Sequence, residues 1–298
     1  MSQIKRYQFL ANNDAIIPDC FESIYLNKKI YPNSSFSNEN LNTKVIYVSL
    51  YPTYLKCKIG NENTLKTKKI VHNGPKGAGI LLEDTYTAET YLKKHAKRQL
   101  KFINRDMKRL EASFSVSYEY NYGYITEEKC DFLLKTLYKM INKRFEQKNT
   151  PHLFMKTWHS KTKDLALLIN KKKASLFVIY ADNKPISISL NRHEGNSILF
   201  SQTHSYDMDF SKFGMGHLDL YMLLNWCINN DFDFLDLGVG LYDYKKKWCN
   251  TFYDIEYRIY YDKKSVLAMG IAQSEILKIK TKNAIKSILA LYNININE

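Results

Sequence analysis

Hydrophobic positions along the chain follow two spacings, and together these predict a mixed fold of strands and helices. Alternating or continuous apolar residues predict strands at 43–51, 232–238 and 251–262, and three strands with tight turns at 182–184 and 194–196 within 174–207. Apolar residues three and four apart predict helices at about 87–111, 127–147, 161–173, 217–229 and 265–292. This pattern predicts an α/β (α+β) fold with mixed, mostly antiparallel sheets flanked by helices.

The predicted helix over about 87–111 has an apolar stripe and a strongly basic remainder. Thr87 is a suitable N-cap. The stripe is formed by Leu92, Ala96, Leu100, Ile103, Met107 and Leu110. The other faces carry Lys93, Lys94, Lys97, Arg98, Lys101, Arg105, Lys108 and Arg109. Two interpretations stay open here: a solvated surface helix, or one wall of an anion-binding cleft.

The stretch "SKFGMG" lies between a predicted strand and a predicted helix. Its residues are Ser211, Lys212, Phe213, Gly214, Met215 and Gly216. The two glycines allow close approach of the backbone to a ligand, and the helix that follows begins with unpaired N–H groups and a positive dipole end. We therefore predict a phosphate or pyrophosphate site here, with Lys212 adding charge. The alternative is a plain turn. "GPKGAG" (74–79) is read as a turn because no helix follows it directly.

The stretch "FDFLDLGVGLYDYKKKW" places a carboxylate near the end of a buried strand. Burial of Asp236 is costly unless the group is paired or takes part in chemistry, so Asp236 is a candidate base. A predicted helix from residue 241 places Tyr244 and Trp248 on one face and Tyr242 near Lys245. The alternative is structural: Asp236 caps the turn, the lysines are solvated, and Tyr244 and Trp248 pack.

Composition and charge narrow the classes of partner. The net charge of +14 favours a nucleic acid, an anionic membrane or a ligand with several phosphates. No apolar run is long enough to cross a membrane, and the N-terminus lacks the apolar region of a signal peptide. Five scattered cysteines predict reduced thiols and a cytoplasmic protein, and the histidines lack metal-ligand spacing, so no metal is predicted.

From residue 174 onward the sequence resembles the GNAT-fold acyltransferases of the CelD/BcsL type, which are related to the FemAB peptidoglycan aminoacyltransferases. That family's pattern D-[FL]-G-x-G-x-x-x-Y-K-x-x-W is matched in full from Asp236 to Trp248. Upstream, residues 91–111 are similar to the basic helix that ends the family's N-terminal half. Ser211 stands where the wider superfamily has Gln or Arg before the glycines.

The resemblance implies tandem GNAT-like halves, with a degenerate half over 1–150 and the acyltransferase half over 151–298. It implies transfer of an acyl group from acyl-CoA to an amine, on a bacterial amino sugar, nucleotide sugar or other cell-envelope or polysaccharide precursor. Asp236 is then the base, Tyr242 or Tyr244 protonates the leaving thiolate, and Lys245 lies beside them. Arg192, His204 and Trp248 are candidate contacts to the acceptor.

Two other functions are compatible with the sequence. A FemAB-like transferase would use aminoacyl-tRNA, with the basic helix binding RNA phosphates, but no long charged coiled-coil insertion is visible. A non-catalytic nucleic-acid-binding protein is less favoured, because the lysine runs lack interleaved aromatic residues and the 236–248 motif would have no explanation. An acyl carrier protein is a further possible donor.

Overall fold

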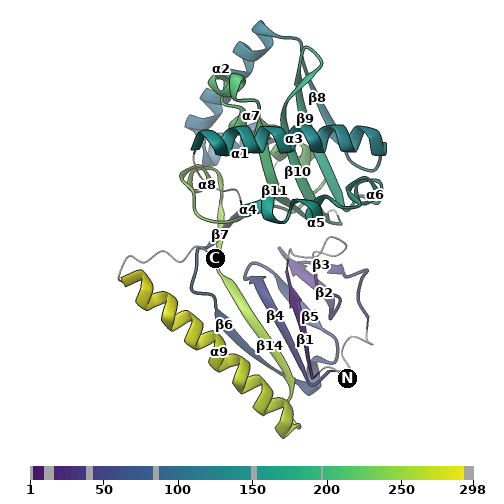
Figure 1. Cartoon of the computed structure of the whole chain (residues 1–298), viewed down its shortest axis with the longest axis vertical. Coiled ribbons are helices and arrows are strands. Elements are labelled where there is room, and N and C mark those ends of the chain that lie inside the picture. The colour runs from purple at the N-terminus through teal and green to yellow at the C-terminus, as the bar shows by residue number, and fades with distance from the viewer. Residues whose placement is uncertain are drawn as a thin grey trace. The chain divides into compact units, whose positions relative to one another are not determined.

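The computed structural model describes residues 3–9, 17–37, 43–82, 87–148, 153–195 and 197–291. These residues form sheets of four, seven and three strands with helices packed against them, so the predicted mixed α/β class is confirmed (Figure 1). The strands are β1 (Ile4–Gln8), β2 (Phe21–Leu26), β3 (Lys29–Pro32), β4 (Val45–Pro52), β5 (Lys56–Ile59), β6 (Leu65–Val71), β7 (Gly77–Leu81), β8 (Val116–Asn121), β9 (Ala174–Ala181), β10 (Lys184–Glu194), β11 (Ile198–Tyr206), β12 (Phe234–Val239), β13 (Thr251–Tyr253) and β14 (Ile255–Asp262). The helices are α1 (Ala88–His95), α2 (Lys97–Ser113), α3 (Glu127–Lys148), α4 (Leu153–Lys156), α5 (Trp158–Thr162), α6 (Leu165–Asn170), α7 (Met215–Asn229), α8 (Asp243–Trp248) and α9 (Val266–Leu291), with short 3-10 helices η2 (Glu62–Thr64) and η3 (Met208–Phe213).

The chain packs as two compact units. Unit 1 contains residues 1–77, 239–241 and 252–298, and unit 2 contains residues 78–238 and 242–251. This grouping by packing differs from a division at residue 150. The reason is that β8 and α3, which precede that position, belong to the sheet and core of unit 2.

Unit 1 is built around a sheet in the order β1-β4-β14-β6. Strand β14, from late in the sequence, lies between β4 and β6 and is antiparallel to both, whereas β1 is parallel to β4. Helix α9 packs on this sheet through Ala268, Ala272, Ile276 and Ile279. The predicted strand over 251–262 is interrupted at Asp254, so β13 and β14 belong to different sheets. A small sheet, β3-β2-β5, completes the described part of this unit.

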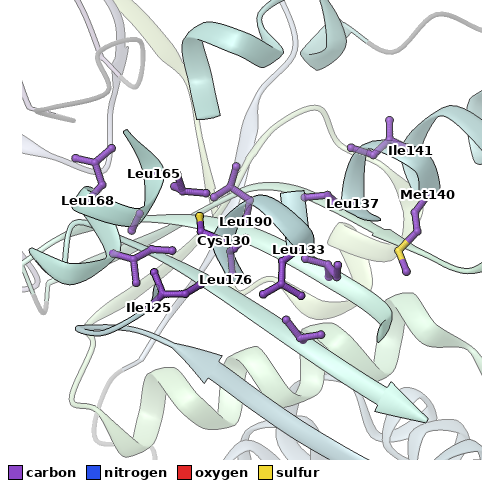
Figure 2. Packing of buried hydrophobic residues seen from close by; sticks show 14 residues of the cluster. Ile125, Cys130, Leu133, Leu137, Met140, Ile141, Leu165, Leu168, Leu176 and Leu190 are labelled. Carbon is purple, nitrogen blue, oxygen red and sulfur yellow. The ribbon is translucent and has the colours of Figure 1, made fainter. Parts of the chain in front are cut away.

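Unit 2 contains the predicted three-stranded meander within the strands β7-β12-β11-β10-β9-β8 of the seven-stranded sheet. The pairs β9–β10 and β10–β11 are antiparallel, as predicted, although Asn196 of the second turn lies outside the described residues. Helices α3 and α6 cover one face of the sheet in a single apolar cluster (Figure 2). Helix α7 contacts the opposite face, because Ser187 hydrogen-bonds to Asp219 of α7 while its neighbour Ile188 packs in the α3–α6 cluster.

The predicted helix over 87–111 is in fact two helices. Ala96 has φ −146° and ψ 46°, which ends α1 and starts α2. Thr87 caps α1 as expected, through a capping box with Thr90. The stripe residues Leu92, Ile103 and Leu110 are buried as expected. With the break at Ala96, α1 and α2 are two separate helices, and both pack against α7. An apolar stripe alone does not indicate such a break, because one straight helix would carry the same stripe.

A second helix prediction is also corrected. The predicted helix over 161–173 with Ser160 as its cap is replaced by two short helices, α5 and α6, separated by Asp164 with φ 55°. Ser160 lies inside α5, where its hydroxyl donates to the Thr157 carbonyl oxygen. In contrast, Thr126 does cap α3, because its hydroxyl oxygen accepts a hydrogen bond from the Lys129 N–H at 3.3 Å.

Candidate active site

Strands β11 and β12 pair in parallel over a short stretch and then separate. The paired residues are Ile198 with Phe234, Leu199 with Leu235, and Phe200 with Asp236. Beyond this point β11 continues to Tyr206 and β12 to Val239. Asp236 is therefore the last residue of β12 in register with β11. The backbone groups on the β12 side of β11 after Phe200 are therefore not paired to β12.

The predicted anion loop forms the junction between η3 and α7. Gly214 has φ +62°, a left-handed conformation that favours glycine, and its carbonyl oxygen accepts from the N–H groups of His217 and Leu218. Residues 211–213 are thus the end of a 3-10 helix, while Met215 and Gly216 are already the first turn of α7.

The first turn of α7 has the features of an anion site. Among the described residues, none accepts a hydrogen bond from the N–H of Met215 or Gly216. Gly216 is exposed, as are Ser211 and Lys212, whereas Phe213 and Met215 are buried and anchor the turn. Unpaired helix-start amides with the positive end of the helix dipole favour a phosphate at this position.

Helix α2 places charged groups against this turn. Asp106 is buried, and its Oδ1 lies 2.8 Å from Arg105 Nη2 and 3.5 Å from Arg109 Nη1. A Cβ at Gly214 would lie 2.9 Å from Asp106 Oδ2. Arg109 Nη1 is also 3.5 Å from the Lys212 carbonyl oxygen. The predicted basic wall is therefore adjacent to the anion turn, with an acid at its centre.

Sequence reasoning missed Asp106, although a signal was present. Asp106 lies three residues after Ile103 and four before Leu110, which are both buried. These spacings place it within the apolar stripe of α2. A carboxylate inside such a stripe is a recognisable exception, because burial of an unpaired charge is costly.

The turn after β12 brings Asp236 and Lys245 together. Asp236 is fully buried, and its Oδ1 accepts a hydrogen bond of 2.7 Å from the Gly238 N–H. Lys245 is also buried, and its Nζ donates to the Gly238 carbonyl oxygen at 2.9 Å. Burial lowers the pKa of Lys245, while the negative charge of Asp236 acts in the opposite direction. The structural alternative for Asp236, capping of the turn, is therefore present in the fold.

Tyr242 and Tyr244 lie at the start of α8 and are both exposed. Their rings stack with centroids 6.4 Å apart, and Lys245 Nζ lies 5.5 Å from the centre of the Tyr242 ring. Burial raises the pKa of Tyr244 to about 12, with Cys249 and Tyr242 contributing further. Tyr244 therefore keeps its proton at neutral pH and is a hydrogen-bond donor.

Trp248 lies in the interior of unit 2. It is fully buried, and its Nε1 donates to His217 Nδ1 at 3.2 Å, with the two rings stacked. Tyr91 of α1 donates to the Trp248 carbonyl oxygen at 2.6 Å. These contacts join α8 to α7 and α1, so Trp248 supports the site. Its predicted contact with an acceptor stays a prediction.

His204 belongs to a polar cluster between the sheet and α7. Its Nε2 lies 2.9 Å from Ser187 Oγ and 3.7 Å from Asp219 Oδ1. Burial raises the pKa of Asp219 to about 8, with hydrogen bonds from Ser189 and Ser187 opposing the shift. Burial, aided by the positive charge of Arg144, lowers the pKa of His204 to about 3. His204 is thus neutral at physiological pH, and its side chain is 19% exposed.

Arg192 and Asp236 pair with the same residue of β11, but the side chain of Arg192 hydrogen-bonds on the side of α5. The register places Arg192 beside Phe200 on β11, and Phe200 beside Asp236 on β12. Arg192 is buried, and its Nη2 donates to the Lys161 carbonyl oxygen at 3.0 Å. The structure therefore groups Asp236 with Tyr242, Tyr244 and Lys245 at one turn, while Arg192 lies toward α5. Its role at a substrate stays a prediction.

Two further features concern the part of the chain that the structure describes. No group of three or more potential ligand side chains that could hold a metal ion occurs there. No described helix has the length and apolar character to cross a membrane. All five cysteines are free thiols.

In this protein two parallel strands, β11 and β12, separate within a mixed sheet that helices cover, and a helix with an anion turn at its start connects them. This is the arrangement of an acyltransferase of the GNAT fold. Residues 97–246 match the family described as Acetyltransferase (GNAT) domain. The chain belongs to this family and is an acyltransferase. No curated protein sequence matches the chain significantly.

Two solved structures are among those similar to this chain. The crystal structure of FemX is 12% identical, covers 72% of this chain and 72% of its own, and has a TM-score of 0.50. L-PGS from Bacillus licheniformis is 13% identical, covers 78% of this chain and 72% of its own, and has a TM-score of 0.44. At such identities the likeness to FemX concerns the fold alone.

Proposed function

We propose that this protein is an N-acyltransferase of the CelD/BcsL type that moves an acyl group from acyl-CoA to the amine of an amino sugar or nucleotide sugar used for the cell envelope. The observation that carries the proposal is the position of the α7 N-terminal turn, which the chain reaches from β11, the strand that separates from β12, through the short helix η3. A donor diphosphate on this turn would direct its acyl arm along the unpaired part of β11. The free cysteines suit a cytoplasmic setting.

Donor binding is assigned to the turn and to the basic groups around it. The N–H groups of Met215 and Gly216 would donate hydrogen bonds to the diphosphate oxygens, with Lys212 as a mobile counter-charge. Arg105 and Arg109 lie close by through their contacts with Asp106 and Lys212, and would add positive charge. Phe213 anchors the turn because it is buried.

The chemistry is assigned to the turn after β12. The acceptor nitrogen attacks the thioester carbonyl carbon, and Asp236 takes a proton from that nitrogen through a water molecule. Backbone N–H groups of β11 stabilise the oxyanion of the tetrahedral intermediate. The C–S bond then breaks, and Tyr242 or Tyr244 protonates the sulfur. The products are an amide and free CoA.

Acceptor contacts are assigned mainly to His204. It is the predicted contact residue with an exposed portion of its side chain, and its neutral ring can both donate and accept hydrogen bonds. Arg192 and Trp248 are buried and serve this assignment as supports of the strand and of α8.

The direct test is stabilisation by acetyl-CoA in a thermal-shift measurement. At about 100 times its Kd, acetyl-CoA would stabilise the protein by about 2.7 kcal/mol. The informative variant is Gly216→Val, because a Cβ there meets only His204 Cε1 at 3.9 Å, an ordinary van der Waals contact. The added side chain would occupy the space of the diphosphate and abolish the shift. A Gly216→Val protein with the wild-type shift would refute the site, and no shift in the wild type would refute CoA as donor.

The acceptor is identified by mass spectrometry. Acetyl-CoA and an acyl carrier protein thioester are incubated with a panel of amino sugars and nucleotide sugars, and the acylated product and free thiol are measured. If only amines that are not sugars are acylated, the protein is still an N-acyltransferase, but the proposal of an amino sugar or nucleotide sugar as acceptor is wrong.

A FemAB-like reaction with aminoacyl-tRNA is the second candidate. The observation that favours it is the exposed basic surface of α1 and α2, which includes Lys97, Lys101 and Lys108. Under this proposal tRNA would give a thermal shift that weakens with salt, and Lys97→Glu/Lys101→Glu would reduce that shift. A shift with acetyl-CoA and none with tRNA favours the first function.

A further inference from the structure

Helix α9 exposes an apolar ridge that the fold of unit 1 does not use. Val266, Leu277, Ile285 and Ile288 are between 50% and 79% exposed. They are separated by eleven, eight and three residues, spacings that keep them on one side of an α-helix. The ridge from Val266 to Ile288 is about 33 Å long at the usual rise per residue. Exposed large apolar side chains gathered in one line indicate an interaction surface.

The opposite side of α9 is held by the sheet of unit 1. Ala268, Ala272, Ile276 and Ile279 pack against β4 and β14 in one buried cluster. Figure 1 shows α9, in yellow, lying along this sheet. Helix α9 is therefore already packed on unit 1 through its other side, and the ridge is the side that remains exposed. A partner can contact it while α9 stays in place.

The charged residues around the ridge are mostly lysines, so the surface around it is positive. Residues 263–291 contain six lysines and one acid, Glu275. Glu275 is buried and pairs with Arg6 and Lys278, so it leaves no free negative charge. Lys278 and Lys280 are exposed and lie on either side of the ridge by helical position.

Strand β6 extends this positive charge beside the helix. Its register pairs Lys68 with Ile259 and Lys66 with Tyr261. Both partners face α9 in the buried cluster, so these two lysines lie on the sheet face that α9 covers. Both are exposed, because β6 is at the edge of the sheet.

We infer that this surface binds an anionic lipid bilayer. The apolar ridge would enter the interface between headgroups and acyl chains, and the lysines of α9 and β6 would contact the lipid phosphates. The exposed residues lie along the outer side of a helix that packs on a sheet, an arrangement that suits a planar, deformable partner. A peptide helix would need a groove to receive it. The inference is independent of the proposed reaction, since all of its residues belong to unit 1.

The test is co-sedimentation of the full-length protein with vesicles. Vesicles of phosphatidylcholine and phosphatidylglycerol would bind the protein, and vesicles of phosphatidylcholine alone would bind it much less. Leu277→Asp/Ile285→Asp would abolish binding. Lys280→Glu/Lys282→Glu would weaken it by about fivefold or more for each lysine reversed, as expected for lysines near an anionic surface. Thermal melts establish that each variant is folded.

Matched variants on another surface of unit 1 serve as controls. Ile30→Asp replaces an equally exposed apolar residue of β3, and Lys28→Glu/Lys56→Glu reverses two exposed lysines near the small sheet. Both would bind vesicles as the wild type does. The inference is overturned if anionic vesicles do not bind, or if the α9 variants bind normally. It is also overturned if light scattering shows a dimer that Leu277→Asp dissociates, which would assign the ridge to a second copy.

Discussion

The Nζ of Lys245 donates a 2.9 Å hydrogen bond to the carbonyl oxygen of Gly238. The same glycine donates its N–H to Asp236, so one turn residue is held by a cation on one side and a carboxylate on the other. The arrangement links the start of α8 to the end of β12. It also explains why a lysine with two exposed lysine neighbours in the sequence is itself buried.

Lys245→Met should lower both stability and turnover. The variant leaves the partly buried Gly238 carbonyl oxygen without its donor, which costs about 1 kcal/mol, and it removes the positive charge next to Asp236. Chemical denaturation and CoA-release rates measure the two effects. Lys246→Met is the control, because Lys246 is exposed and pairs with the exposed Asp243. Equal behaviour of the two variants would contradict the structural role of Lys245.

Asp236→Asn should slow turnover without changing the fold. Asparagine keeps an oxygen that can accept the Gly238 N–H, but it cannot take a proton. Loss of a general base lowers the rate by about 10²–10⁴-fold, while the Kd for acetyl-CoA stays the same. Steady-state kinetics and calorimetric titration test this, with Asp243→Asn as the exposed control. Unchanged kcat in Asp236→Asn would remove it as the base.

Gly214→Ala should destabilise the protein, whereas Gly216→Ala should not. At Gly214 the backbone has φ +62° and a new Cβ would lie 2.9 Å from Asp106 Oδ2, so the cost is about 1–3 kcal/mol. At Gly216, alanine favours the helix and meets no close neighbour. Urea denaturation of the two variants makes the comparison. Equal stabilities would show that the left-handed turn is not required.

Asp219→Asn should change how stability depends on pH. The folded-state pKa of Asp219 is about 8, far above that of an unfolded aspartate. The folded protein therefore holds a proton that the unfolded chain releases, and this contribution is lost as pH rises from about 4 through 8. Asparagine removes the loss, so the variant should melt at least about 3 °C above the wild type at pH 9.

That difference should shrink toward pH 5, where Asp219 is protonated in the folded protein. Scanning calorimetry across this range tests the sign of the effect. A gap that is constant with pH, or one that grows on acidification, would contradict a raised pKa for Asp219.

The sequence predicted the parts of the site that depend on local pattern. The meander over 174–206, the strand that carries Asp236 and the helix after Gly214 all follow from apolar spacing and turn residues, and the structure contains them. The burial of Trp248 did not follow, because the helical spacing of Tyr244 and Trp248 places them on one side without saying whether that side meets solvent. Their different exposure comes from the packing of α8 on α1 and α7.

Long-range pairing was the other part that local pattern could not supply. Nothing near residues 255–262 indicates that they pair with strands more than 180 residues earlier, such as β4 and β6. The break at Ala96 was missed for a related reason, since neither glycine nor proline marks it. Asp106 was recognisable only as an acid within an apolar stripe, and its contact with the 214 turn depends on how α2 crosses η3.

The place of β14 between β4 and β6 has a consequence for biosynthesis. On the ribosome, β1, β4 and β6 emerge long before β14, which lies between β4 and β6 in the folded sheet. The edges of β4 and β6 therefore stay unpaired while some 180 further residues are translated. Unit 2 has nearly all of its sequence by then and can complete its core first. In nascent chains that stop before residue 255, we expect unit 2 to be folded and resistant to protease. In the same chains β1, β4 and β6 should be cleaved readily. Chaperones would therefore engage the N-terminal segment during translation.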